Sequence, residues 1–226
     1  MKKVSMIIRA YNRLEWTIET LSSIITTTTD YDNYEIILVN NNSKDGTTEW
    51  LDWIKENSAF YSSKIKHIKC DKNLGDWYGM VEGLKHVSED SEYVMQIDND
   101  VQVFDKEWLN KLVFVLENYP TKMAMLKRIG IDMRYELKPK NGEKQLTYNG
   151  EVLTLWEVER PVCCYIIKTS DFRNFTVKYD GINGRESKYT LLKEFGFTAK
   201  IVNVVCNTRI NVGKYINTNK NVREFI

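Results

Sequence analysis

The chain has 226 residues, of which 42% are hydrophobic and 28% are charged, and its formal net charge at pH 7 is +1. This length allows one large domain with a full core or two very small domains, and the apolar and charged fractions are those of an ordinary soluble protein. A net charge so close to zero gives no general attraction to nucleic acid or to anionic membranes, so we do not expect a nucleic-acid partner unless a local basic patch provides one.

The cysteines and the apolar runs bear on the cellular compartment. Cys163 and Cys164 are adjacent, and together with Cys70 and Cys206 they show no metal-ligand spacing. We therefore expect four reduced thiols in a reducing compartment, and a cytoplasmic protein. The apolar run at residues 4–8 is too short for a secretory signal, and no apolar stretch is long enough to cross a bilayer. The sequence thus predicts no transmembrane segment.

In the first half of the chain, strand and helix patterns alternate. Short β-branched, apolar runs predict strands at residues 4–8, 35–39, 65–70, 93–97 and 123–126. Apolar residues at helical spacing predict helices at about residues 14–25, 47–57, 76–87 and 106–119. Such alternation is typical of an α/β fold with a mainly parallel sheet and helices on both faces.

The second half is less regular. It contains a predicted hairpin at residues 145–153 with an Asn149-Gly150 turn, followed by a buried strand at 162–168. A helix at 187–195, ended by Gly196, and a last strand at 200–205 are expected after it. We see no linker or repeat, so we expect one domain with two lobes.

Polar residues follow three of the predicted strands, at positions 10–13, 40–47 and 98–100. The carboxyl ends of parallel strands meet at one edge of the sheet, where α/β proteins bind ligands. We therefore expect these three segments to line one site.

The two acids of the third segment, Asp98 and Asp100, are one residue apart at a strand end. Carboxylates this close repel each other unless a cation lies between them, and such oxygen ligands suit Mg²⁺ or Mn²⁺. A solvated acidic turn is the alternative for the isolated pair. The position on the shared edge favours a metal site that binds a diphosphate.

Four motifs make the chain resemble the family 2 glycosyltransferases of the GT-A fold. They are the opening strand with its Tyr-Asn turn at 4–13, the Val-Asn-Asn-Asn-Ser-Lys-Asp-Gly-Thr run at 39–47, Asn73-Leu74-Gly75 followed by Gly79 and Gly83, and Asp98-Asn99-Asp100. The resemblance is close from Val4 to Asp100 and weaker beyond. It implies a Rossmann-like sheet flanked by helices, with a smaller mixed lobe on the acceptor side. We expect a single domain over 1–226, in which about 1–104 bind the nucleotide sugar and about 105–226 form the acceptor side and the tail.

The resemblance also implies an activity: metal-dependent, inverting and non-processive transfer of a hexosyl or pentosyl group to an acceptor hydroxyl. The donor would be a nucleotide-diphosphate sugar, with a UDP-sugar favoured, and the acceptor a glycan or glycoconjugate. The residues implied to bind the nucleotide are, by position, Ala10, Tyr11, Arg13, Asn40, Asn42, Asp98 and Asn99. Asp98 and Asp100 are implied to bind Mn²⁺ or Mg²⁺.

The catalytic base implied by the resemblance is a carboxylate in a Gly-x-Glu-Asp-like stretch before a helix. The matching stretch is Gly184-Arg185-Glu186-Ser187, so Glu186 is the candidate and Asp180 the reserve. An equally good interpretation of Glu186 is a charge in the first turn of a helix, favoured by the helix dipole.

Several positions depart from the family pattern. Asn40 replaces the usual Asp, Arg9 replaces the common Pro, Ser187 replaces an acid, and Cys206 stands about where some members have a metal-binding His. The Gln-x-x-Arg-Trp motif of processive synthases is absent, which favours single transfers.

Other motifs leave alternatives open. Arg209 and Lys214 could contact the diphosphate or belong to a solvated basic tail, and Gly75, Gly79 and Gly83 fit close helix packing better than phosphate binding. A non-catalytic sugar-binding module and a sugar nucleotidyltransferase are the alternative functions. No phosphate-binding Gly-rich loop of a P-loop NTPase or a dinucleotide dehydrogenase is found.

Overall fold

The computed structural model describes residues 1–129, 139, 141–182 and 184–208, and all statements below concern these residues. The strands are β1 (Lys3–Ala10), β2 (Tyr34–Asn40), β3 (Ile65–Lys69), β4 (Ser91–Asp98), β5 (Val101–Val103), β6 (Met123–Ile129), β7 (Glu143–Tyr148), β8 (Glu151–Val158), β9 (Cys164–Lys168) and β10 (Thr198–Thr208). The helices are α1 (Leu14–Thr27), α2 (Thr47–Asn57), α3 (Ala59–Lys64), α4 (Gly75–Leu84), α5 (Trp108–Asn118), α6 (Thr169–Lys178) and α7 (Gly184–Phe195).

All strands belong to one sheet with the order β3-β2-β1-β4-β9-β6-β10-β8-β7, and β5 pairs with β10. The first four strands in this order are parallel, as the alternating sequence pattern predicts. Beyond β4 the sheet is mixed, because β9 runs antiparallel to both β4 and β6. The fold is thus the expected α/β fold, and its mixed part coincides with the irregular second half of the sequence.

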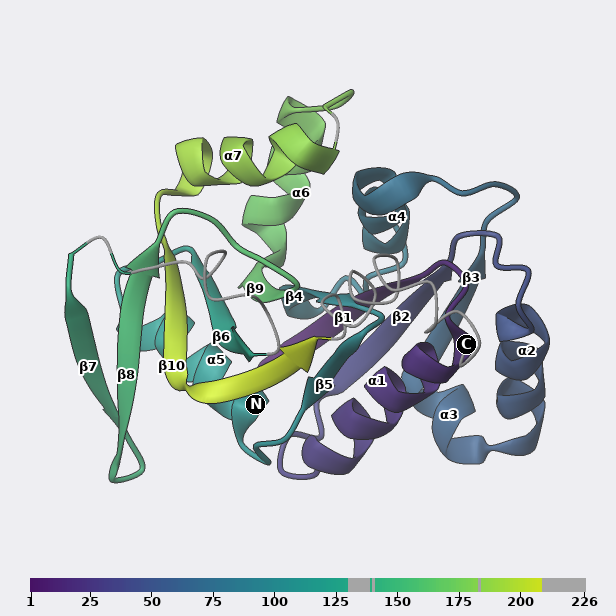
Figure 1. The fold of residues 1–226 in the computed structure, drawn as a ribbon, viewed down its shortest axis with the longest axis horizontal. Helices are drawn as coiled ribbons and strands as arrows, with labels where there is room; N and C mark the ends of the chain where they lie inside the picture. The colour runs from purple at the N-terminus through teal and green to yellow at the C-terminus, as the bar shows by residue number, and fades with distance from the viewer. Residues whose placement is uncertain (130–138, 140, 183, 209–226) are drawn as a thin grey trace, which may run out of the picture.

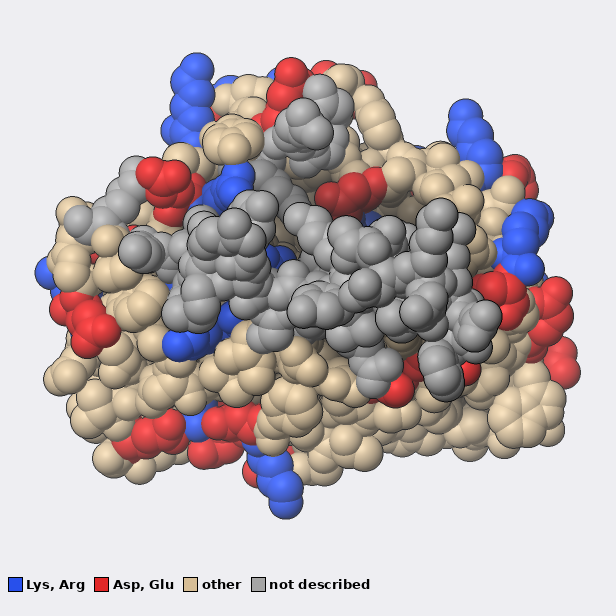
Figure 2. Space-filling view, in the orientation of Figure 1, with Lys and Arg blue, Asp and Glu red and all other residues tan. Residues whose placement is uncertain are grey.

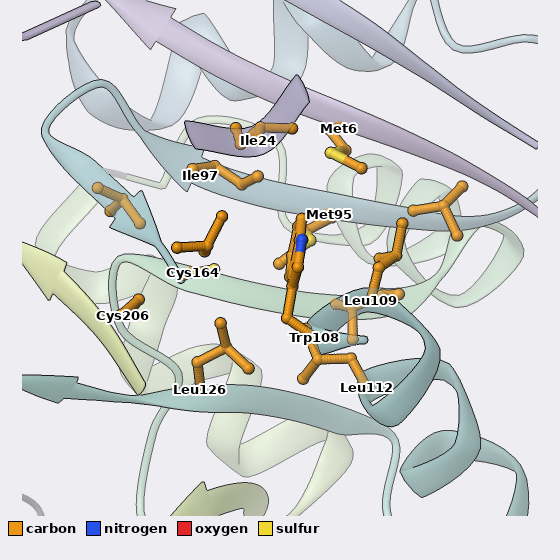
Figure 3. Packing of buried hydrophobic residues seen from close by; sticks show 14 of the residues in the cluster. Met6, Ile24, Met95, Ile97, Trp108, Leu109, Leu112, Leu126, Cys164 and Cys206 are labelled. Atoms are coloured by element: carbon orange, nitrogen blue, oxygen red, sulfur yellow. The ribbon is translucent and has the colours of Figure 1, made fainter. Parts of the chain in front are cut away.

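One face of the sheet is covered by α1, α2 and α5. Its core includes Ile24, Ile54 and Trp108, each buried against the strands. Figure 3 shows Trp108 lying against Met95 of β4. The indole Nε1 of Trp108 donates a hydrogen bond to Thr28 Oγ1 at 3.1 Å, so the polar N–H of this buried ring has a partner.

The opposite face is covered by α4, α6 and α7, which lie together along the upper side of Figure 1. Here α4 approaches the sheet closely, because its glycines leave no side chain in the way. A Cβ on Gly83 would come within 3.0 Å of Val39 Cγ2, and one on Gly79 within 2.9 Å of Asn41 Nδ2. Close packing is therefore confirmed for these two glycines, whereas Gly75 has a φ of 75° and serves a turn.

Some elements differ from those expected. Neither α3 nor β5 was predicted, and α1 continues through Thr27, whose hydroxyl bonds Ser23 O at 2.6 Å. The predicted hairpin turn is confirmed, with left-handed φ values of 48° at Asn149 and 85° at Gly150. All four cysteines are free thiols. Within the described ranges, none of the helices has the length and apolarity needed to span a bilayer.

Candidate functional site

The loops after β1 and β2 are joined by hydrogen bonds between their backbones and side chains. The Asn12 N–H donates to Ser43 Oγ at 2.9 Å, and Asn12 Oδ1 accepts from the Lys44 N–H at 2.8 Å. The Leu14 N–H donates to Asp45 Oδ2 at 2.8 Å. The two loops therefore form one platform at the carboxyl edge of the sheet, where the sequence placed them.

Asp45 holds the second loop and the starts of two helices. It also accepts from the Thr47 N–H at 3.2 Å and from Thr47 Oγ1 at 2.5 Å. Burial alone would raise the pKa of Asp45, but the bonds from Thr47 and Leu14 lower it below its usual value. Gly46 adopts a φ of 91°, which favours glycine. The Asp-Gly-Thr run thus has a structural role that joins α1 to α2.

The loop after β1 bends sharply. Asn12 and Arg13 both have left-handed φ values, 56° and 62°, which is unusual for two consecutive residues other than glycine. The Thr17 N–H bonds the Arg13 carbonyl, so α1 begins from this turn. The Arg13 guanidinium lies 4.7 Å from the ring centroid of Trp16. This bend places a half-exposed arginine at the site.

A cleft of about 520 Å³ lies at this edge of the sheet. Its lining residues come from the last residues of β1 and β4 and from the segments after β1, β2, β3 and β4. They are Arg9, Tyr11, Asn12, Arg13, Asn41, Asn73, Gly75, Asp76, Asp98, Asn99 and Asp100. Both acids of the Asp-x-Asp motif are among them, together with the Tyr-Asn turn. Residues of all three strand-end segments therefore line one cleft, with Asn41 representing the second segment.

Asp100 differs from the other acids of the cleft in how deeply its carboxylate is buried. Its side chain is 4% exposed, and its Oδ1 is buried without a hydrogen-bond partner among the described residues. Its Oδ2 lies 3.4 Å from Arg13 Nη1. Burial and the neighbouring charge of Asp98 raise the pKa of Asp100 to about 6. A buried carboxylate with an unused oxygen leaves the site short of positive charge, which a divalent cation would supply.

Asp98, the last residue of β4, is held quite differently. Its Oδ1 pairs with Arg9 Nη2 and also accepts from Gln96 Nε2 at 3.2 Å. Its N–H donates to Cys163 O at 2.9 Å, and Cys163 itself has a φ of 36°. A hydrogen bond with Cys206 and burial raise the pKa of the Cys163 thiol well above its usual value, so this thiol stays protonated. Asp98 therefore has a fixed position and a partly neutralised charge.

The side chains of the cleft could bind a cation such as Mg²⁺ or Mn²⁺ only if a bound substrate supplied further oxygen ligands. Within residues 1–129, 139, 141–182 and 184–208, no three His, Cys, Asp or Glu side chains are grouped to hold a metal ion. Mg²⁺ and Mn²⁺ often bind through one or two carboxylates, with substrate phosphates completing the shell. Asp98 and Asp100 could provide the protein's part of such a site.

The cleft contains some of the residues proposed from the sequence and lacks others. It contains Tyr11, Arg13, Asp98, Asn99 and Asp100. Three predicted nucleotide-binding residues are not in its lining, namely Ala10, Asn40 and Asn42. Ala10 is fully buried at the end of β1, and the amide of Asn40 is bonded to Thr48 Oγ1 at 2.8 Å and to the Ser43 N–H at 3.0 Å.

The two candidate bases lie in the other lobe. Glu186 is exposed in the first turn of α7, and Asp180 is exposed in the connection between α6 and α7. Neither belongs to the lining of the cleft, although α7 packs against α4, whose first turn does. Arg209 and Lys214 fall outside the described residues.

Asn12 and Asn41 lie in the strand-end segments that were expected to line the site, whereas Arg9, Asn73, Gly75 and Asp76 were not proposed as lining residues. For Arg9 a signal existed, because a charged residue directly follows the apolar pair Ile7-Ile8 at the end of a predicted strand. For Asp76 there was none, since an acid in the first turn of a helix is ordinary.

Comparison with known proteins agrees with this architecture. A model of glycosyl transferase family 2 matches residues 5–193. The chain is 33% identical over 102 residues to a poly-beta-1,6-N-acetyl-D-glucosamine synthase of Staphylococcus epidermidis. The matching segment covers 45% of this chain and 23% of that protein. It is 35% identical over 122 residues to an uncharacterized glycosyltransferase of Haemophilus influenzae, covering 54% and 35% respectively. The chain thus spans well under half the length of these relatives.

Solved structures share the fold at low sequence identity. The mannosyltransferase PcManGT from Pyrobaculum calidifontis, in complex with GDP-Man and Mn²⁺, has a TM-score of 0.66 at 18% identity, over 91% of this chain and 56% of that one. GalNAc-T7 with UDP, GalNAc and Mn²⁺ has a TM-score of 0.70 at 12% identity, over 92% and 44%. S. aureus TarS 1-349 has a TM-score of 0.64 at 16% identity, over 91% and 60%. The chain belongs to glycosyl transferase family 2 and has the GT-A fold.

Proposed function

We propose that this chain is the catalytic domain of a metal-dependent, inverting glycosyltransferase that uses a nucleotide-diphosphate sugar. The observation that carries the proposal is the buried Oδ1 of Asp100, which has no hydrogen-bond partner in the described part of the chain and lies in a cleft lined by the family 2 motifs. An orphaned carboxylate oxygen costs stability unless a ligand uses it. A cation that also binds a diphosphate would meet this need. Residues 1–104 would then form most of the donor half, and 105–226 the acceptor half.

The residues of the cleft suit the leaving group of such a reaction. A bound Mn²⁺ or Mg²⁺ would offset the negative charge that develops on the nucleoside diphosphate as the glycosidic bond breaks. Asp100 would hold this cation, and the Arg13 guanidinium, 3.4 Å from Asp100 Oδ2, would add positive charge at the same place. Tyr11, which is 48% exposed in the cleft, offers a ring for stacking on the nucleoside.

The acceptor hydroxyl must lose its proton to a base. Glu186 is our first candidate because it is exposed in the first turn of α7, the helix that packs on α4. Asp180 is the reserve. A single attack by the hydroxyl on the side opposite the leaving group would invert the anomeric centre. The acceptor would be a glycan or glycoconjugate. On the described part of the face in Figure 2, acidic and basic side chains are interspersed, which gives little support to a nucleic-acid acceptor.

The donor base is the least constrained part of the proposal. Both polar atoms of the Asn40 side chain are engaged within the loop, so the base would be recognised by other groups. We keep a UDP-sugar as the favoured donor, with GDP-sugars as the comparison. The same engaged amide also favours the second candidate, a sugar-binding module without turnover. Four free thiols support a reducing, cytoplasmic location, and the missing processive motif supports single transfers.

The test is binding and turnover of a panel of UDP- and GDP-sugars with and without Mn²⁺. We expect one donor to bind only when Mn²⁺ is present and to be hydrolysed slowly without an acceptor. Glu186→Gln should keep donor binding and lose about 10²-fold or more in transfer. Glu56→Gln, an exposed change on α2, is the matched control. If no nucleotide sugar binds, the proposal is wrong, and if a donor binds without any turnover, the binding module replaces it.

A further inference from the structure

Arg9 is a buried charged residue near the end of β1, a strand whose other residues from Val4 on are buried and, apart from Ser5, apolar. It precedes the last residue of β1 and is paired in register with Asp98 of the neighbouring strand β4. Its side chain is only 6% exposed, yet it lines the cleft. Its Nε is buried without a partner among the described residues. A guanidinium buried at this cost contributes little to stability, so its presence points to a role in the site.

The two ends of the guanidinium bind two different acids. Nη2 pairs with Asp98 Oδ1, while Nη1 pairs with Asp76 Oδ1 and donates to the Asp76 carbonyl at 2.7 Å. Asp76 lies in the first turn of α4. The rigid planar fork of an arginine can bridge two acceptors in this way, which a lysine ammonium cannot do with the same geometry. Arg9 therefore ties the end of β4 to the start of α4.

This contact makes the two acids of the Asp-x-Asp motif unequal. Asp98 has a guanidinium in direct contact with Oδ1, and Gln96 Nε2 bonds the same oxygen at 3.2 Å. Among the described residues, Asp100 Oδ1 has no hydrogen-bond partner, and Asp100 Oδ2 lies 3.4 Å from Arg13 Nη1. A divalent cation approaching Asp98 would meet the positive charge of Arg9 beside it, whereas Asp100 presents a free oxygen.

We propose that Arg9 is a positioning residue that keeps Asp98 out of the inner coordination shell of the cation and reserves it as a hydrogen-bond acceptor for the donor. Asp100 is then the protein's sole carboxylate ligand. The Asp98 side chain is 24% exposed and lines the cleft, and its contacts with Arg9 and Gln96 both engage Oδ1, so Oδ2 would be the oxygen that accepts from a hydroxyl of the donor. This inference rests on the proposed function, since it assigns roles within the same site.

A double-mutant cycle on Mn²⁺ affinity tests the inference without measuring activity. Mn²⁺ binding is followed by electron paramagnetic resonance in the wild type, Arg9→Met, Asp98→Asn and the double variant. In the wild type, Asp98→Asn should change the dissociation constant less than about twofold. Arg9→Met should tighten Mn²⁺ binding, and in that background Asp98→Asn should weaken it about fivefold or more, because Asp98 has become a ligand. Additive effects would mean that Arg9 acts only by general electrostatics, and would overturn the inference.

A second comparison avoids the risk that Arg9→Met does not fold. In the wild-type background, Asp100→Asn should weaken Mn²⁺ binding about tenfold or more, whereas Asp98→Asn should leave it nearly unchanged and instead weaken binding of UDP in calorimetry. Equal losses of Mn²⁺ affinity in the two variants would overturn the inference even if UDP binds normally. If the wild type binds neither Mn²⁺ nor any nucleoside diphosphate, the proposed function fails and the inference fails with it.

Discussion

The side-chain amide of Asn99 donates a hydrogen bond to the hydroxyl of Thr17 at 3.0 Å, in the buried space between the acidic motif and α1. The same amide reaches the Asn12 carbonyl at 3.4 Å. The middle residue of the motif therefore joins the loop after β4 to the helix and the loop that follow β1. This contact fixes the backbone between the two acids, and it gives Asn99 a supporting role beside its proposed part in nucleotide binding.

Replacing Asn99 by Ala should destabilise the protein by about 1–2 kcal/mol, because the buried Thr17 hydroxyl, which still donates to the Arg13 carbonyl, loses the hydrogen bond from Asn99. It should also weaken Mn²⁺-dependent donor binding, since the acids lose their fixed spacing. Urea unfolding and calorimetry measure the two effects. Thr17→Val and the Asn99→Ala, Thr17→Val double variant complete a double-mutant cycle. We expect the double variant to be no less stable than Asn99→Ala alone. Strictly additive losses would show that the two side chains act independently.

Asp100→Asn should stabilise the folded protein but abolish its Mn²⁺-dependent binding of nucleotide. The charge of Asp100 is held in a buried place that raises its pKa to about 6, so its removal should stabilise the metal-free protein by about 1–3 kcal/mol at neutral pH. Mn²⁺-dependent binding of nucleotide should be lost. Thermal melting with and without Mn²⁺ and UDP measures both. Asp90→Asn, a change at an exposed acid, is the control, and a lower melting temperature for Asp100→Asn would contradict the prediction.

Asp45→Ala should cost about 1–2 kcal/mol of stability, as expected for the loss of a side chain that caps a helix start. The backbone N–H groups of Leu14 and Thr47 would both lose their acceptor. Because the same loop supports the cleft, donor affinity should fall as well. Asp45→Asn keeps an acceptor oxygen and should lose less. Denaturant unfolding of the two variants distinguishes them, and equal losses would mean that charge alone matters.

Gly83→Ala should destabilise the protein even though alanine favours helices. The added Cβ would come against Ile7 and within 3.0 Å of Val39 Cγ2, and a crowded core site of this kind costs about 1–3 kcal/mol. Gly196→Ala is the comparison, because there a Cβ meets nothing within 4 Å and only the left-handed φ of 79° is strained. Urea unfolding should rank Gly83→Ala as the more damaging change. A stabilised Gly83→Ala variant would show that α4 can move away from the sheet.

Glu35 should make the stability of the folded protein depend on pH. Burial would raise its pKa, but bonds from Lys66, Ser5 and Ser88 lower it to about 2. A carboxylate with a depressed folded-state pKa contributes stability that is fully present above the unfolded value of about 4.5 and is lost as the pH falls toward 2. Its contribution at neutral pH is about 2–3 kcal/mol.

The measurement is urea unfolding of the wild type and Glu35→Gln between pH 7 and pH 2.5. The variant should be less stable at pH 7, and the difference should shrink steadily below pH 4.5. Glu56→Gln, at an exposed position, should follow the wild type throughout. A constant difference between wild type and Glu35→Gln across this range would refute the assignment.

The shared edge and its acids could be predicted because the relevant signals are local. Each strand is a short apolar run, and the polar residues that follow it must lie at its carboxyl end. The Asn149-Gly150 turn and the Gly196 stop were also predicted from single residues with a known backbone preference. Such features do not depend on which strand lies beside which.

The remaining features depend on neighbours that are distant in sequence. The contact between Arg9 and Asp98 requires β1 to lie beside β4, a strand order that no local pattern gives. The direction of the Asn40 amide is set by Thr48 and Ser43 across a turn. The helix α3 is six residues long and has no fully buried residue, with only the partly buried Tyr61 packed on the core, and β5 is only three residues long.

The last strand, β10, has a consequence for how the chain assembles on the ribosome. It pairs with β6, β8 and β5, and a register shift between Ile201 and Val205 lets it serve partners at both of its ends. The four parallel strands need no residue beyond Asp98 to pair with one another, so they can fold early in synthesis. The hairpin of β7 and β8 must wait with an open edge until β10 emerges, and the nascent chain is exposed to mispairing during that interval.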